Sequence, residues 1–130
     1  MKMIWFVVFF FLAIGIYFSL NQSKKMKFEK DYVSGSEGLD IYNSETHLFL
    51  DVRTEEENLD NAIPNSLLIP LQELNDRLEE LNDFKDKNII VYCASGSRSA
   101  NATTFLRRIG FQAQNLEGGM FSWNGPTTKY

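Results

Sequence analysis

The segment that most constrains the fold joins three local structures in immediate succession. Residues 88–92 contain four consecutive apolar residues and predict a buried strand. Residues 93–98 are mostly small and include a glycine, which predicts a tight loop. From Ser99 to Ile109, apolar side chains recur at helical spacing. A strand, a short loop and a helix in this order are the unit from which parallel α/β sheets are built.

The same alternation of strand and helix patterns is present from residue 47 onward. Residues 71–84 carry leucines on one stripe and charged side chains opposite, which predicts an amphipathic helix with a solvated outer face rather than a metal site. Strands separated by helices predict a parallel sheet with right-handed crossovers. The predicted strands are 47–52, 66–69, 88–93 and 112–116, and the predicted helices are 55–59, 71–84, 99–109 and a short one near residue 120.

Cys93, the only cysteine, lies where the predicted central strand ends and the loop begins. Loop N–H groups and the positive end of the following helix can surround its sulfur, and Arg98 adds a cation nearby. These features lower a thiol pKa and predict a thiolate nucleophile. An inert buried cysteine is the alternative, since free cysteine is commonly a core residue. The glycine and arginine that follow favour the reactive site, because a core strand needs neither.

Residues 93–99 resemble the Cys-x-x-Gly-x-Arg-Ser loop of single-domain rhodanese-like sulfurtransferases. Residues 50–53, 63–70 and 116–123 are similar to three further family segments in the same order, so the resemblance covers residues 30–126. It implies an α/β rhodanese-like three-layer sandwich, with a central, mostly parallel sheet flanked by helices. No metal or other cofactor is expected.

The resemblance also implies the chemistry. Cys93 is the expected catalytic residue, which takes a sulfane sulfur from a donor such as thiosulfate and passes it, as a persulfide, to a thiol or cyanide. Four residues separate Cys93 from Arg98, whereas related phosphatases have five, and the smaller loop favours a single sulfur over phosphate. The expected substrate-binding residues are Ala94, Ser95, Gly96, Ser97, Arg98 and Ser99.

Two further residues are expected to support the site from the end of the strand 47–52. Asp51 is expected to brace the cysteine loop by accepting hydrogen bonds, rather than to contact substrate. Two roles are open for Arg53: it pairs with Glu56 or Glu57, or it adds positive potential at the mouth of the site.

The chain departs from the family at residues 61–66, where Asn-Ala-Ile-Pro-Asn-Ser replaces the usual Gly-His-Ile-x-Gly-Ala. The change leaves the sulfur chemistry intact but alters a segment near the site, and with it the substrate. The only histidine, His47, is interpreted as the first residue of a strand rather than as a base or a ligand.

Residues 3–20 contain no charged residue and seven aromatic ones. A spanning helix needs about 20 apolar residues, so the segment predicts one uncleaved, single-pass transmembrane helix. A cleaved signal peptide is the alternative, but its apolar region is shorter, about 7 to 15 residues. Lysines gather after the segment, and the positive-inside rule then predicts a cytoplasmic soluble domain. The opposite orientation, with Lys2 inside, stays open.

The sequence therefore predicts an N-terminal membrane anchor (1–23), a polar linker (24–30) and one rhodanese-like domain (31–130). The net charge of −4 and the absence of a basic-aromatic stripe argue against nucleic-acid binding. The expected partners are a small sulfur-containing anion, or a protein persulfide or thiol, with the membrane at residues 3–20. Two alternatives remain: a membrane-tethered, non-catalytic interaction module of the same fold, and a sulfur-relay carrier. The sequence does not determine the oligomeric state.

Overall fold

The computed structural model describes residues 2–25 and 30–130, and within α1 its side-chain description ends at Tyr17. The elements of the first half are α1 (Lys2–Lys25), β1 (Tyr32–Val33), α2 (Gly35–Ile41), β2 (His47–Asp51), α3 (Glu55–Asp60) and β3 (Leu67–Leu68). Those of the second half are η1 (Leu71–Glu73), η2 (Asn75–Phe84), β4 (Asn88–Tyr92), α4 (Ser97–Arg108), β5 (Ala113–Leu116) and η3 (Gly119–Ser122), where η marks a 3₁₀ helix.

The described strands form a five-stranded sheet in the order β1-β5-β4-β2-β3, and every adjacent pair is parallel. β2 and β4 lie next to each other, with Leu50 opposite Val91. Strands covered on both faces are apolar along most of their length, as residues 89–92 of β4 are. The parallel sheet and the four predicted strands are confirmed as β2, β3, β4 and β5, while β1 and α2 have no counterpart among the predicted elements. All strands end at the same edge, and Cys93 follows β4 there.

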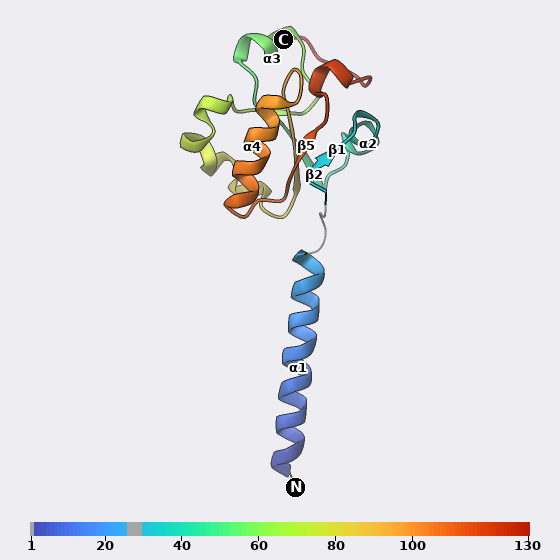
Figure 1. Cartoon of the computed structure of the whole chain (residues 1–130), viewed down its shortest axis with the longest axis vertical. Coiled ribbons are helices and arrows are strands. Elements are labelled where there is room, and N and C mark those ends of the chain that lie inside the picture. Colours follow the sequence, from blue (N-terminus) through green and yellow to red (C-terminus); the bar gives the residue numbers. More distant parts are fainter. Residues whose placement is uncertain (1, 26–29) are drawn as a thin grey trace.

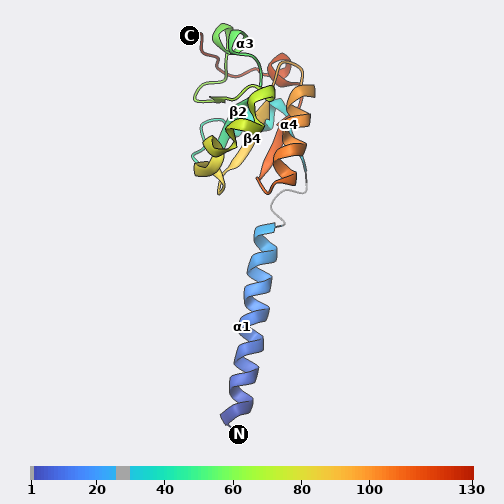
Figure 2. The ribbon, with the colours of Figure 1, turned by 90° about the vertical axis from the view of Figure 1, so that its left-hand side faces the viewer.

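Helices cover both faces of the sheet, which gives the predicted three layers. Successive strand residues point to opposite faces of the sheet. Val91 therefore lies in the core covered by α4, η1 and η2, while Ile90 and Tyr92 lie in the core covered by α2 and η3. Figure 1 shows α4 and α2 on opposite sides of the strands, and Figure 2 shows α4 and the segment 71–84 from the side they cover. Cys93 belongs to the core on the α4 side.

Residues 71–84 are two 3₁₀ helices, and the prediction of one α-helix is therefore wrong. Arg77 interrupts the helical geometry with φ −116° and ψ 19°. A 3₁₀ helix has three residues per turn, and the apolar residues on each side of this interruption are indeed three apart: Leu71 and Leu74 before it, and Leu78, Leu81 and Phe84 after it. The stripe still packs on the core, where Leu74 and Leu81 are buried.

The departure at residues 61–66 has a structural explanation at two of the altered positions, 62 and 65. Asn65 adopts φ 61° in the place of the family's second glycine, and asparagine tolerates this left-handed region better than most residues. Ala62, in the place of the histidine, is fully buried and forms an antiparallel bridge with Thr128 near the C-terminus. The segment thus keeps its turn and is covered by the end of the chain.

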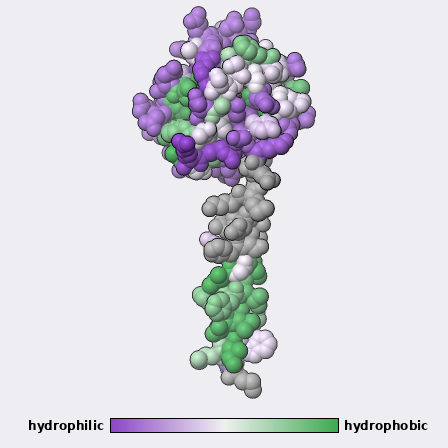
Figure 3. Space-filling model, viewed as in Figure 1, coloured by the Kyte–Doolittle hydropathy of each residue, from purple (hydrophilic) through white to green (hydrophobic). Residues whose placement is uncertain are grey.

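Residues 2–25 form one continuous helix, α1, whose described side chains are exposed and mostly apolar (Figure 3). In the part of the chain that the structure describes, no helix combines the length and the apolarity needed to cross a membrane. The predicted transmembrane anchor is therefore not supported. The predicted linker at residues 24–30 falls mostly on residues 26–29, which lie outside the described residues.

Candidate active site

The sulfur of Cys93 lies at the start of a loop that surrounds it with donors. The Gly96 N–H donates to Sγ at 3.1 Å. From the first turn of α4, the Ser99 N–H donates at 3.4 Å and the Ser99 hydroxyl at 3.3 Å. Cys93 itself is 1% exposed. The predicted arrangement of strand, loop and helix N-terminus is confirmed, and it is built to hold a negative charge on sulfur.

These donors change the ionisation of the thiol. Burial of the sulfur acts to raise the pKa of Cys93, because it disfavours the charged form. The Ser99 hydroxyl and three backbone N–H groups, those of Ser99, Gly96 and Ser95, act in the opposite direction. Their combined effect is larger, and the pKa of Cys93 lies below its ordinary value. The loop therefore stabilises a thiolate even though the sulfur is buried.

Gly96 gives the loop its shape. It adopts φ 100°, a left-handed conformation that favours glycine. A Cβ at this position would lie 3.1 Å from the Gly118 backbone nitrogen, so the neighbouring segment also leaves little room. The Asn115 side chain on β5 donates to the Gly96 carbonyl at 3.1 Å and fixes the loop from the side of the sheet.

The segment 117–121 holds the Cys93 loop through hydrogen bonds to its backbone carbonyl groups. The Met120 N–H donates to the Cys93 carbonyl at 2.9 Å, and the Phe121 N–H donates to the Ala94 carbonyl at 3.0 Å. Gly119 lies directly against these carbonyls, since a Cβ on it would come within 2.8 Å of the Ala94 carbonyl oxygen. Residues 117–119, Glu-Gly-Gly, lie in the segment 116–123 that resembles the family, and this segment thus holds the Cys93 loop in place.

Arg98, the predicted cation of the site, is held by a partner that the sequence did not single out. Its guanidinium forms a bidentate ion pair with Glu57 on α3, at 2.8 Å and 2.7 Å. This pair raises the pKa of Arg98, and an interaction with Cys93 raises it further. Hydrogen bonds from Arg98 in turn lower the pKa of Glu57 to about 2. The Arg98 guanidinium is therefore bound to the Glu57 carboxylate and also interacts electrostatically with Cys93.

Glu57 is fixed from its other side by the start of α3. Thr54 precedes this helix, and its N–H donates to Glu57 Oε2 at 3.0 Å. The Glu57 N–H donates back to the Thr54 hydroxyl at 3.3 Å. This is a capping box, Thr-x-x-Glu, which is readable in the sequence as a helix start. The motif locates Glu57 on α3 but carries no signal for its contact with Arg98.

The expected roles of Asp51 and Arg53 need correction. Asp51, fully buried, accepts hydrogen bonds from the Arg53 N–H at 2.9 Å and from its guanidinium at 2.8 Å. It also accepts one from Asn58. Asp51 therefore braces Arg53 rather than the cysteine loop, and Arg53 pairs with Asp51 rather than with Glu56 or Glu57. The reason is that Asp51 and Arg53 are only two residues apart at the end of β2. The Asp51 carboxylate therefore reaches both the backbone N–H and the guanidinium of Arg53.

The remaining predicted loop residues line the exposed side of the site. Ser95 and Ser97 are exposed and their hydroxyls lie 3.5 Å apart. Ala94 is half-buried, and its carbonyl accepts a hydrogen bond from the Phe121 N–H of η3.

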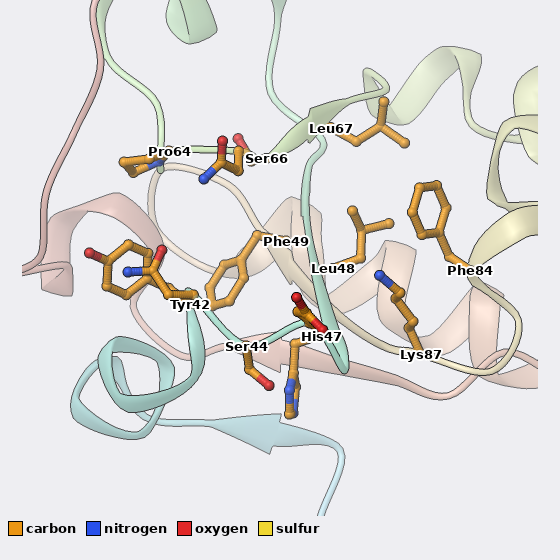
Figure 4. A pocket seen from close by; sticks show the side chains of 13 residues that line it. Tyr42, Ser44, His47, Leu48, Phe49, Pro64, Ser66, Leu67, Phe84 and Lys87 are labelled. Carbon is orange, nitrogen blue, oxygen red and sulfur yellow. The ribbon is translucent and has the colours of Figure 1, made fainter.

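A cavity of about 440 Å³ lies elsewhere, at the opposite end of the parallel strands (Figure 4). Leu48 and Phe49 of β2 line it with Phe84 and Lys87. His47 also lines it and is the first residue of β2, as predicted, with Asn88 at 3.2 Å from its ring. No cysteine contributes to the lining, so this cavity is separate from the reactive loop.

Residues 35–126 match the model of the rhodanese-like domain family. The chain belongs to that family. It is 34% identical over 84 residues to a sulfurtransferase from Allochromatium vinosum, which covers 64% of this chain and 77% of that protein. The crystal structure of a rhodanese-like domain protein from Staphylococcus aureus has a TM-score of 0.70 and 32% identity, covering 77% of this chain and 98% of that one. A rhodanese-related protein from Thermoplasma volcanium has a TM-score of 0.68 and 33% identity, covering 75% and 96%.

Proposed function

We propose that this rhodanese-like protein is a sulfurtransferase that works through a persulfide on Cys93. The observation that carries the proposal is the set of donors on one buried sulfur: the Gly96 N–H, the Ser99 N–H and the Ser99 hydroxyl all point to Sγ. Such donors stabilise a thiolate before the reaction and a persulfide anion after it. The relatives that are sulfurtransferases support the same reaction class.

The reaction has two balanced steps. In the first, the Cys93 thiolate attacks the sulfane sulfur of a donor such as thiosulfate. The new bond joins Sγ to that sulfur, the donor's S–S bond breaks, and sulfite leaves with the bonding electron pair. In the second step, an acceptor thiolate or cyanide attacks the outer sulfur of the persulfide. The Cys93–sulfur bond then breaks, and Cys93 leaves as the thiolate that the loop already stabilises.

The test is the intact mass of the full-length chain before and after thiosulfate, and again after a reducing thiol. We expect a gain of about 32 Da, one sulfur, that the thiol reverses. Cys93→Ser is the matched control and should show no gain. An unchanged mass of the wild-type chain with every sulfane donor tried would reject the proposal and leave the binding module as the better function.

We further propose that α1 attaches the chain to a membrane, with the rhodanese-like domain on the cytoplasmic side. The support is its exposed apolar side chains, among them Trp5, Phe9 and Phe11, together with the lysines at its C-terminal end and just beyond it in the sequence. The test is cosedimentation of the full-length chain with phospholipid vesicles. The double variant Phe9→Lys, Phe11→Lys should remain in the supernatant, and equal sedimentation of both chains would contradict attachment.

A further inference from the structure

Both arginines that the sequence places at the site have their charge balanced by a carboxylate. Arg53 is 3% exposed and paired with the fully buried Asp51. Arg98 is paired with Glu57 through both terminal nitrogens of its guanidinium. The positive potential that two arginines would give the reactive loop is therefore largely cancelled. The backbone N–H groups and the N-terminus of α4 remain as the main attraction for an anion.

The Glu57–Arg98 pair differs from the buried one because it faces solvent. Each side chain is 34% exposed. The low pKa of Glu57, about 2, means that its carboxylate stays charged at any pH near neutrality. Arg98 directly precedes Ser99, whose N–H and hydroxyl donate to Cys93 Sγ, and the charge of Arg98 interacts with that of Cys93. A donor that approaches the sulfur therefore meets a fixed negative charge next to the cation that would otherwise attract it.

We propose that Glu57 is a specificity-determining residue: by neutralising Arg98 beside Cys93, it favours sulfur donors of low negative charge, such as the persulfide of a thiol, over dianions such as thiosulfate. The inference rests on the proposed sulfur transfer and names its donor class. The chemistry is unchanged: the Cys93 thiolate attacks the outer sulfur of the donor persulfide, and the donor leaves as a thiolate.

Physical chemistry gives the direction and the scale of the effect. The repulsion between Glu57 and a bound donor grows in proportion to the donor's charge. Removal of one unit charge several Å from the reacting sulfur, in a partly exposed site, then changes the relative rates for a dianion and a monoanion by about five-fold. Because the pair faces solvent, added salt screens the effect.

The experiment compares two donors that transfer the same sulfur with different charge. Thiosulfate is a dianion that releases sulfite, and methanethiosulfonate is a monoanion that releases methanesulfinate. The rate of persulfide formation on Cys93 is measured by intact mass in full-length wild type and in Glu57→Gln. Glutamine keeps the oxygen that accepts from Thr54, since a capping box tolerates either residue, so α3 retains its start.

We expect wild type to react with both donors, and Glu57→Gln to raise the ratio of the thiosulfate rate to the methanethiosulfonate rate by about five-fold. The gain should shrink at an ionic strength of about 0.5 M. Glu56→Gln is the matched control, because it removes the same charge from an exposed neighbouring position on α3, and it should change the ratio much less.

Other outcomes have distinct meanings. An unchanged ratio in Glu57→Gln, or an equal fall in both rates, would overturn the inference and leave Glu57 as a structural partner of Arg98. A rise in the ratio as large in Glu56→Gln would also overturn it, since the effect would then come from net charge alone. No persulfide on wild-type Cys93 with either donor would reject the proposed function itself.

Discussion

Gly119 lies against the carbonyl groups of Cys93 and Ala94 so closely that no side chain fits between them. It also adopts φ 53°, in the left-handed region. The next residue, Met120, donates its N–H to the Cys93 carbonyl at 2.9 Å. The position of the reactive cysteine thus depends on a glycine that is distant from it in the sequence.

Gly119→Ala should therefore destabilise the protein and impair sulfur transfer. The methyl group must displace the backbone of the reactive loop, and we expect a loss of about 3 kcal/mol in the free energy of unfolding. Gly110→Ala is the control, because Gly110 has φ 101° but no atom within 4 Å of an added Cβ, and it should cost about 1 kcal/mol. Urea denaturation measures both. Equal losses in the two variants would show that close packing at Gly119 is unimportant.

Ser99→Ala should raise the pKa of the Cys93 thiol. The Ser99 hydroxyl donates to the sulfur at 3.3 Å and contributes to the lowered pKa. Loss of this hydrogen bond removes a donor that stabilises the thiolate, so the thiol pKa moves back toward its ordinary value. The pH dependence of thiol alkylation measures the shift. Ser97→Ala is the control, since the Ser97 hydroxyl lies near Ser95 instead, and a shift of the same size in that variant would contradict the assignment.

Asp51→Ala should be among the most destabilising single substitutions in the domain. It would leave the Arg53 guanidinium buried without its carboxylate, and loss of one partner of a buried pair costs about 3 to 5 kcal/mol. Glu80→Ala, which breaks the more exposed pair with Arg77, should cost less than about 1 kcal/mol. The comparison is made by urea denaturation, and a small loss in Asp51→Ala would mean that Arg53 finds other partners or water.

The stabilising effect of Glu57 should disappear in acid. Its pKa falls from 4.5 to about 2 on folding, chiefly through its hydrogen bonds with Arg98. The ionised carboxylate therefore favours the folded state above pH 4.5, and this contribution is lost as the pH falls toward 2. The difference in unfolding free energy between wild type and Glu57→Gln should be constant near neutrality and narrow below pH 4.5. Urea denaturation across this range measures it, and a constant difference down to about pH 3 would contradict the assigned ion pair.

Local patterns in the sequence were sufficient for β2, β3, β4 and β5 and for the loop that follows Cys93, but not for β1. The apolar run 89–92 predicts a buried strand because it is short, rich in β-branched residues and followed at once by a loop of small residues. Gly96 and the helical spacing after it then determine the turn around Cys93, since these preferences act over a few residues. The segment 71–84 shows the limit of such patterns. The three-residue spacing of its apolar side chains was present in the sequence, but such a stripe of leucines is equally typical of an amphipathic α-helix.

By itself, the sequence determined the parallel α/β class, the place of Cys93 at the end of β4 and the donors that follow it within six residues. Only the tertiary structure decided what surrounds that loop. Glu57 reaches Arg98 across 41 residues, and Gly119 reaches Cys93 because β5 lies beside β4. Such contacts depend on which elements the sheet order brings together, and residue types along the chain do not encode them locally. The place of Cys93 in its loop is therefore a property of the sequence, and the charge around it is a property of the fold.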